Sequence, residues 1–405
     1  MNKISILINW SREIDMYENF IKIIPSDKVD IIINDIKTLE KERKNNSSDI
    51  EKTLTLQNKK FRFFSEIFNK EKYKVLISTG QASSLKISFY SIFRFIYGQL
   101  IGRFLEFTNI SKILIKIFNR PFTADGKKCQ VGMIWYPERK IGKTVIKFPS
   151  GMDLKLKHYP NNDLEKNFDI FFTHSQLEND LIKKKFQKKI CKVIGYPRYD
   201  LLDQKQDILN ELNNDFKLDI RKKIIFWTPT HIHYSKETHI NFLPWVEKIS
   251  ELRKYYNIIV RPHPKSLKVL PELKEKLKQK GFFVDTKSDR KIGNIFKVSD
   301  LVLCDYGGTI FSAIYLEKPI VLLNMDYKSE FIKDLKNNIS LDLEIRSDLA
   351  NIDLKSSTEE IKLKILNSLD LNYKNKILDM KKKYFGSYRK DLHVEIKSFL
   401  LSYLS

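Results

Sequence analysis

The chain has 405 residues and a mass of 48.0 kDa, which is enough for two domains that each bury a core. Its composition, with 42% hydrophobic and 30% charged residues, is that of a globular protein. Lys and Arg outnumber Asp and Glu by 73 to 50, and a net charge of +23 favours anionic partners. No zinc-finger spacing, RNP-type motif or long basic tail accompanies this charge, so we expect no nucleic acid partner. Anionic lipid surfaces and phosphorylated substrates remain as candidate partners.

The cysteines and the apolar runs bear on location. The three cysteines have no Cys-x-x-Cys spacing, and Cys191 and Cys304 lie in apolar runs typical of core thiols in a reducing compartment. The N-terminal residues lack the cleavage pattern of a signal peptide. No run of about 18 apolar residues is free of charge, so we predict no membrane span. We therefore expect a cytoplasmic location.

The first half of the sequence predicts a doubly wound α/β domain. Strand-like runs at 4–8, 29–33 and 73–78 are separated by segments of helical character, and the third enters a turn at Gly80. Further strands are predicted at 131–135, 144–148, 168–173 and 190–194. The polar, Asn-rich segment after Asp203 marks the expected boundary, which gives an N-terminal acceptor-side domain of residues 1–205.

Residues 85–118 interrupt this pattern. They are dense in Ile, Phe, Leu and Tyr and carry spaced cations. One interpretation is buried helices with exposed charges. The other is a basic amphipathic surface that lies on the anionic inner face of the cell membrane, which would make the protein peripheral there.

The second half repeats the alternation of strands and helices over residues 206–375, followed by a helical tail at 376–405. Four predicted strands end in residues suited to ligand binding: Thr228-Pro229-Thr230, Arg261-Pro262-His263-Pro264, Asp305-Tyr306-Gly307-Gly308-Thr309, and Asn324 to Asp326. If the strands are parallel, all four segments lie at one edge of the sheet, where open α/β sheets bind their ligands.

The segment from Asp300 to Pro319 is central to this pattern. An apolar strand, a glycine turn and a helix together can bind a phosphate through bare amides and the positive helix end. A tight turn without a ligand is the alternative. The neighbouring strand ends favour the phosphate site.

Histidines add two further hypotheses. Arg261 offers a forked donor to phosphate, and His263 could neutralise a leaving phosphate or accept a hydroxyl proton; a structural hydrogen bond is the alternative for His263. His231, His233 and His239 have a spacing that suggests metal binding, but no nearby Cys or carboxylate pattern completes a site. We therefore predict no metal.

These motifs as a set resemble the CDP-glycerol glycerophosphotransferases, the wall teichoic acid and capsule polymerases. The resemblance rests on the Thr-Pro-Thr turn, Arg-Pro-His-Pro, Asp-Tyr-Gly-Gly-Thr…Glu-Lys-Pro and the preceding Gly195-Tyr196-Pro197-Arg198-Tyr199-Asp200, over about residues 130 to 330. It implies an α/β GT-B architecture, with two Rossmann-like domains facing a cleft. It also implies metal independence and a lipid-linked or polymer acceptor. The nucleotide-linked donor is then a substrate, and no cofactor is expected.

The sequence departs from the family in two places. Gly307-Gly308 replaces the Ser-Ser that usually follows Asp-Tyr, which keeps the amides but loses the hydroxyls unless Thr309 supplies one. Ser150-Gly151 replaces a His-Gly pair whose histidine is the presumed base. Serine needs an activating group to act as a base near neutral pH. Asp153 or His158 could substitute.

The resemblance implies a transferase that moves a polyol-phosphate or glycosyl group from a nucleotide-activated donor to a cell-surface polymer. Ser150 and Gly151 would line the N-domain side. Asp305 or Glu317 would reach the ribose or stabilise the turn. The donor phosphates would be bound by residues at the strand ends, namely Thr228, Thr230, Arg261, His263, Gly307, Gly308 and Thr309. The alternatives are a nucleotide-sugar 2-epimerase and a non-catalytic polyanion- or membrane-binding protein on the same scaffold.

Overall fold

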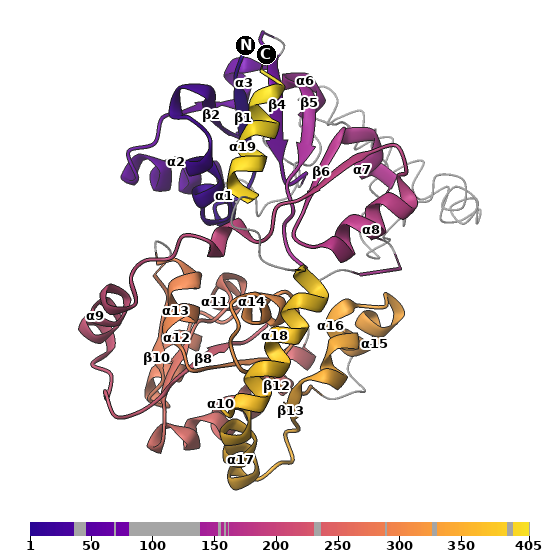
Figure 1. Cartoon of the computed structure of the whole chain (residues 1–405). Helices are drawn as coiled ribbons and strands as arrows, with labels where there is room; N and C mark the ends of the chain where they lie inside the picture. The colour runs from indigo at the N-terminus through magenta and orange to yellow at the C-terminus, as the bar shows by residue number, and fades with distance from the viewer. Residues whose placement is uncertain are drawn as a thin grey trace, which may run out of the picture.

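The computed structural model describes residues 1–35, 46–68, 70–80, 138–152, 155–157, 159–160, 162–230, 236–287, 290–325, 330–386 and 392–404. These residues form two lobes, an N-terminal one coloured indigo to magenta and a C-terminal one coloured mainly orange in Figure 1. The predicted membrane-facing segment 85–118 lies outside the described residues, as do Asp153, His158, His231 and His233. No helix within the described ranges is long and apolar enough to cross a membrane.

The N-terminal lobe is built on a seven-stranded parallel sheet with the order β3-β2-β1-β4-β5-β6-β7. Ile4, Ile6 and Ile8 of its first strand pack into one apolar cluster, while Leu7 packs into the cluster on the opposite face. This alternation follows from the two-residue period of a strand, and burial on both faces is what a parallel sheet requires. The strands are β1 (Ile4–Ile8), β2 (Val29–Ile33), β3 (Phe61–Phe63), β4 (Tyr73–Ser78), β5 (Gly142–Lys147), β6 (Ile170–Thr173) and β7 (Ile190–Val193).

Helices cover both faces of this sheet, as predicted for a doubly wound domain. Where sequence features set a helix end, they follow ordinary capping chemistry: Ser175 accepts a hydrogen bond from the amide of Glu178 and so begins the helix after β6. The helices are α1 (Arg12–Ile23), η1 (Ser26–Lys28), α2 (Asn46–Leu56), α3 (Phe64–Ile67), α6 (Glu138–Ile141), α7 (Asn162–Asn167), α8 (Gln176–Lys185) and η3 (Pro197–Tyr199).

The C-terminal lobe has a six-stranded parallel sheet with the order β10-β9-β8-β11-β12-β13. In chain order this is 3-2-1-4-5-6, the strand order of dinucleotide-binding folds. The order reverses between β8 and β11, which are paired in register from Leu301↔Ile225 to Cys304↔Thr228. The strands are β8 (Ile224–Thr228), β9 (Asn257–Val260), β10 (Phe283–Val284), β11 (Leu301–Cys304), β12 (Ile320–Leu323) and β13 (Ala350–Ile352).

The polar segment that marks the predicted boundary near residue 205 forms the first helix of this lobe, and its Ile208 and Leu212 are buried in the lobe's core. The helices are α9 (Lys205–Phe216), α10 (Lys236–Ser250), η4 (Glu251–Lys254), α11 (Pro264–Val269), α12 (Leu273–Gln279), α13 (Ile292–Val298), α14 (Thr309–Tyr315), α15 (Glu330–Asn337), α16 (Leu341–Glu344), η5 (Ile345–Asp348), α17 (Thr358–Ser368), α18 (Leu371–Phe385) and α19 (Leu392–Ser402).

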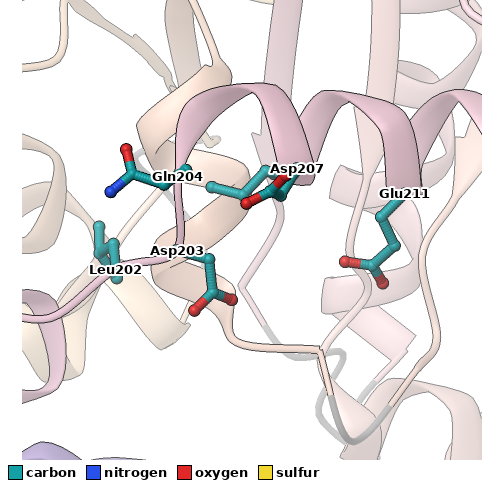
Figure 2. Close-up of a pocket in the computed structure, with 6 residues that line it drawn as sticks. Leu202, Asp203, Gln204, Asp207 and Glu211 are labelled. Atoms are coloured by element: carbon teal, nitrogen blue, oxygen red, sulfur yellow. The ribbon is translucent and has the colours of Figure 1, made fainter.

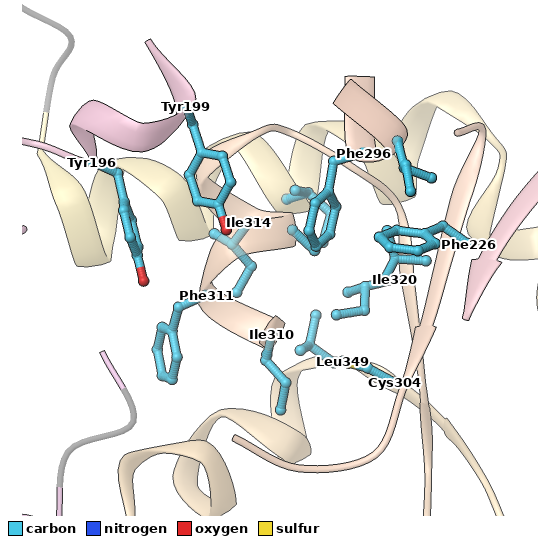
Figure 3. Close-up of a cluster of buried hydrophobic side chains, with 14 of the residues drawn as sticks. Tyr196, Tyr199, Phe226, Phe296, Cys304, Ile310, Phe311, Ile314, Ile320 and Leu349 are labelled. Carbon is cyan, nitrogen blue, oxygen red and sulfur yellow. The ribbon is translucent and has the colours of Figure 1, made fainter. Parts of the chain in front are cut away.

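An aromatic cluster joins the two lobes. Tyr196 and Tyr199, which follow β7, pack with Phe296 and Phe311 of the C-terminal lobe (Figure 3). The Tyr199 hydroxyl donates a hydrogen bond to Ser312 Oγ at 2.9 Å. The segment that resembles the family's Gly-x-Pro-Arg-x-Asp motif therefore serves as the apolar connection between the lobes.

The C-terminal tail predicted at 376–405 contains the end of α18 and all of α19, and these two helices pack on different lobes. Ile377 and Met380 of α18 are buried in the core of the C-terminal lobe. Ile396 and Leu400 of α19 are buried against the first sheet, and Figure 1 places the two chain ends together on the N-terminal lobe. The apolar residues of each helix thus cover a different sheet, and the chain crosses between the lobes twice.

Candidate functional site

The candidate site lies at the carboxyl edge of the second sheet, where the strand order reverses. Thr228 ends β8 and Cys304 ends β11, and the two are direct neighbours. The strands β9, β8, β11 and β12 are consecutive in the sheet and all parallel. The described residues of the four segments singled out by the sequence therefore share one sheet edge, as predicted; Asp326 lies outside the described residues.

Asp305 ties two of these segments together. Its Oδ1 accepts hydrogen bonds from the amides of Thr230 at 2.7 Å and Tyr306 at 3.0 Å. The side chain is buried, and burial raises the pKa of this carboxyl to about 6. Asp305 therefore stabilises the turn, which is one of the two roles expected for it.

Gly307 adopts a backbone conformation that favours glycine, with φ at +93°. A Cβ atom at this position would meet nothing within 4 Å, so conformation and not crowding calls for glycine here. The Gly307 amide donates a hydrogen bond to Asp342 Oδ2 at 2.8 Å. One of the amides predicted to bind phosphate is thus already bound by a carboxylate of the chain itself.

Gly308 and Thr309 differ from Gly307 in this respect. Gly308 is the N-cap of α14, and its carbonyl accepts a hydrogen bond from the Ser312 amide at 3.1 Å. No described residue accepts a hydrogen bond from the amides of Gly308 or Thr309. Amides at the start of a helix that lack an internal acceptor can bind an anion such as a phosphate oxygen.

Two buried residues that the sequence analysis missed support this turn. Arg346 donates hydrogen bonds to the carbonyl of Asp305 and to Leu323 O at 3.0 Å, and its guanidinium lies 4.1 Å from the centre of the Tyr306 ring. It therefore links the carboxyl ends of β11 and β12. Asp342 belongs to the preceding helix α16. The only sequence signal for Arg346 is a lone cation among alternating acidic and apolar residues, and no motif points to Asp342.

Arg261 is placed at the end of β9, as predicted, but its guanidinium is engaged within the lobe. It forms an ion pair with Asp285 Oδ2 at 3.1 Å and donates to Arg290 O at 2.9 Å and Lys287 O at 3.0 Å. Burial lowers the pKa of Arg261 despite the neighbouring carboxylate. These contacts hold the segment after β10 in place. His263 is partly exposed and precedes α11, where its carbonyl accepts a hydrogen bond from the Ser266 amide at 2.8 Å.

Glu317 does not join the other predicted donor-binding residues. It lies at the opposite end of α14 from Gly308, and it forms an ion pair with Lys381 at 2.6 Å. A seven-residue helix is about 10 Å long, so the two ends of α14 cannot contact the same small group.

On the first sheet, Ser150 and Gly151 follow β5, with Ser150 exposed and Gly151 partly buried. The segment that continues from them contacts the C-terminal lobe. Leu156 N donates to Ile339 O at 3.1 Å and Lys157 N donates to Asn338 O at 3.2 Å. The carboxyl-edge segments of the two sheets therefore meet.

The carboxyl edge of the first sheet is dense in buried charge. Glu13 accepts hydrogen bonds from the Asn9 amide and the Thr79 hydroxyl, both at 2.7 Å, and Glu138 accepts from Ser78 and Asn167. Burial raises the pKa of Glu138. Burial also lowers the pKa of Lys147, the last residue of β5, to about 8, against the opposing effect of nearby glutamates.

His174 is a further buried group at this edge. Its ring stacks on Tyr196 with 3.8 Å between ring centres, and its Nδ1 lies 2.8 Å from Gly195 O. Burial lowers the pKa of His174 to about 3, so the imidazole is neutral at physiological pH. Nδ1 then donates to the carbonyl, and Nε2 has no hydrogen-bond partner among the described residues.

Two further features of the described residues bear on ligand binding. They contain no group of three or more His, Cys, Asp or Glu side chains arranged to hold a metal ion. A depression of about 400 Å³ lies beside the start of α9 (Figure 2). It is lined by Asp203, Asp207 and Glu211 among others, and this negative charge opposes an anionic ligand.

A comparison with known protein families matches the middle part of the chain. Residues 150–339 match the family model for CDP-glycerol:poly(glycerophosphate) glycerophosphotransferase. The predicted family resemblance is confirmed. A teichoic acid glycerol-phosphate primase of Bacillus spizizenii is 28% identical over 167 residues, which are 40% of this chain and 42% of the relative. The chain thus spans less than half of the length of this primase.

Solved structures give the fold. The wall teichoic acid polymerase TagF aligns with a TM-score of 0.56 and 17% identity, covering all of this chain and 89% of that one. A UDP-GlcNAc 2-epimerase from Neisseria meningitidis aligns with a TM-score of 0.51 and 12% identity, covering 99% and 100% of the two chains. These similarities confirm the predicted GT-B-like α/β architecture of two lobes.

Proposed function

We propose that this protein is a glycerophosphotransferase that uses CDP-glycerol as donor and a teichoic-acid-type polymer as acceptor. One observation carries the proposal. The matched region, 150–339, contains the whole switch point of the second sheet, including the amides of Gly308 and Thr309, which have no acceptor among the described residues. A diphosphate is the anion that such a position in an open sheet is suited to bind.

In the proposed reaction an acceptor hydroxyl oxygen attacks the β-phosphorus of CDP-glycerol. The bond from that phosphorus to the bridging oxygen breaks, CMP leaves with the bridging oxygen, and the hydroxyl proton passes to a base. We assign the amides of Gly308 and Thr309, with the Thr228 and Thr230 segment, to the diphosphate. His263 follows β9 at the same sheet edge, and we assign to it the donation of a proton or hydrogen bond to the leaving phosphate.

Three predicted residues receive modified roles. Asp305 holds the Thr230 and Tyr306 amides and so shapes the site. Arg261 positions the segment after β10 through Asp285. Glu317 has no part in donor binding. We retain Asp153 or His158 as the base, beside Ser150 and Gly151, because both follow β5 in the sequence.

A panel of nucleotides tests the function. The protein is incubated with CDP-glycerol, CMP-sugars and UDP-sugars, and thermal stabilisation and nucleotide release are measured. We expect stabilisation by CDP-glycerol and release of CMP when a poly(glycerol phosphate) acceptor is added. Stabilisation by UDP-sugars alone would favour an epimerase or glycosyltransferase. Stabilisation by CDP-glycerol without CMP release would favour the non-catalytic alternative.

We also propose that the basic protein binds the anionic membrane surface where a lipid-linked acceptor is located. The net charge of +23 supports this proposal. Sedimentation with phosphatidylglycerol vesicles over a salt series tests it. Binding should be present at low salt and lost as salt rises, and absence of binding even at low salt would contradict it.

A further inference from the structure

A chain of contacts connects the N-terminal lobe to the turn at Gly307 and Gly308, which we call the donor turn. It begins at Lys155, which forms an isolated antiparallel bridge with Ser340 of the C-terminal lobe. Lys155 Nζ also contacts Asp334 Oδ2 at 2.8 Å, and the Leu156 amide donates to Ile339 O. We refer to residues 155–157 and 338–340 together as the interlobe ladder.

The ladder continues directly into the turn. The Ser340 hydroxyl donates a hydrogen bond to Asp342 Oδ1, and Asp342 Oδ2 accepts the Gly307 amide at 2.8 Å. Asp342 and Ser340 are buried, so water does not compete for these bonds. A single carboxylate thus has one oxygen bound from the ladder and the other bound to the turn.

The backbone of the ladder is strained at one residue. Ile339 has φ at +51° and is half exposed, and a β-branched residue rarely adopts this conformation. Two bonds that end α15 maintain this conformation, from the Ile339 amide to Lys336 O and from the Ser340 amide to Leu335 O, both at 3.0 Å, and the Leu156 amide binds the Ile339 carbonyl from the other lobe. Release of residues 155–157 therefore removes part of what holds Ile339 and the following Ser340.

We propose that Asp342 is a positioning residue that couples docking of the N-terminal lobe to the shape of the donor turn. With the ladder formed, Ser340 orients Asp342, Asp342 holds Gly307, and the amides of Gly308 and Thr309 stay directed at a diphosphate. Without the ladder, the turn loses this anchor. The inference rests on the proposed function for the identity of the ligand, but the coupling itself is independent of any ligand.

Hydrogen–deuterium exchange without nucleotide tests the coupling. The readout is the exchange rate of peptides covering 305–315 in the full-length protein. Asp342→Ala removes the acceptor, and we expect the rate to rise about tenfold. Asp342→Asn keeps one acceptor oxygen and should restore much of the protection. Glu344→Ala removes an exposed carboxylate from the same helix and should leave the rate unchanged.

A second pair of variants tests the N-terminal side. Leu156→Pro removes the amide that donates to Ile339 O, whereas Leu156→Ala retains it. We expect faster exchange at 305–315 for Leu156→Pro than for Leu156→Ala, although the substitution lies in the other lobe. The double variant with Asp342→Ala should show less than the product of the two separate effects, because both break one chain of contacts.

Affinity then separates this inference from the proposed function. In isothermal titration with CDP-glycerol, we expect Asp342→Ala to weaken binding about tenfold and Glu344→Ala to leave it unchanged. Failure of the unmodified protein to bind CDP-glycerol, with the exchange effects intact, would overturn the proposed function alone. Unchanged exchange at 305–315 in Asp342→Ala, or equal exchange in Leu156→Pro and Leu156→Ala, would overturn the inference.

Discussion

The strands of the two sheets follow the same order, 3-2-1-4, when they are counted along the chain within each sheet. The polar groups at the carboxyl edges of the two sheets nevertheless differ. Each sheet reverses direction next to its first strand, between β1 and β4 in one and between β8 and β11 in the other. At the first edge, Glu13 and Glu138 are buried and their oxygens are bound by neighbouring side chains and amides. At the second edge, the amides of Gly308 and Thr309 have no internal acceptor among the described residues. The same topology thus gives one edge whose buried carboxylates are bound by the chain itself and one whose amides at Gly308 and Thr309 could bind an anion.

The largest effect is expected for His263→Ala, which tests whether the second edge carries chemistry. If His263 assists the leaving phosphate, its loss should lower CMP release by a factor of about 10² to 10⁴. CDP-glycerol affinity should fall much less, and the melting temperature should stay close to that of the unmodified protein. Equal losses in affinity and turnover would assign His263 to binding alone.

The next effect concerns the turn itself. Gly307→Ala forces a side chain into a positive φ, and we expect a loss of about 1–2 kcal/mol in the free energy of unfolding. The matched control is Gly308→Ala, since Gly308 has φ at −64° and any residue adopts that value. Chemical denaturation measures the free energy of unfolding of both variants. A smaller loss for Gly307→Ala than for Gly308→Ala would contradict the assignment of strain to Gly307.

His174 provides a test of the first edge through pH. Its pKa is about 3 in the folded protein and near 6.5 when exposed, so the unfolded chain binds the extra proton between these values. Stability should therefore fall as pH decreases from 6.5 towards 3, by up to about 1.4 kcal/mol per pH unit. Asp305, whose pKa is raised, acts in the opposite direction over pH 3.8 to 6.

A comparison with the His174→Phe variant isolates the contribution of His174 protonation to the free energy of unfolding. The variant keeps a ring to stack on Tyr196 but cannot bind a proton. The difference in unfolding free energy between the two proteins should shift in favour of the variant as pH falls, and a constant difference across pH 6.5 to 4 would show that His174 is not held neutral by burial.

The smallest effect is expected for Tyr199→Phe, at the connection between the lobes. It removes one buried hydrogen bond to Ser312 and leaves the aromatic packing in place. We expect a loss of about 1 kcal/mol in unfolding free energy. Ser312→Ala should give a similar loss, and the double variant should be less destabilised than the sum.

The sequence predicts the second edge better than the first for physical reasons. Apolar runs followed by Thr228-Pro229-Thr230 or Gly307-Gly308 identify buried strands and their ends from local residues alone, and parallel pairing then brings the ends together. At the first edge, Glu13 and His174 appear in no local pattern, because their burial depends on partners distant in the chain.

The same dependence on partners distant in the chain explains why the structure places Arg261 and Glu317 in other contacts than those predicted, and why Asp342 was not predicted. Arg261 is conspicuous in the sequence, but Asp285 and the carbonyls that occupy it belong to another strand and loop. Glu317 follows a helix whose length decides that it lies away from Gly308. Asp342 is 35 residues from Gly307, so only the folded chain brings its carboxylate to the turn.

The most direct test of the central claim is a crystal structure of the protein with CDP-glycerol. We expect the diphosphate to lie at the carboxyl ends of β8 and β11, with oxygens accepting hydrogen bonds from the amides of Gly308 and Thr309. The Gly307 amide should remain bound to Asp342. A diphosphate located at the first sheet, or bound on the second lobe away from these amides, would contradict it.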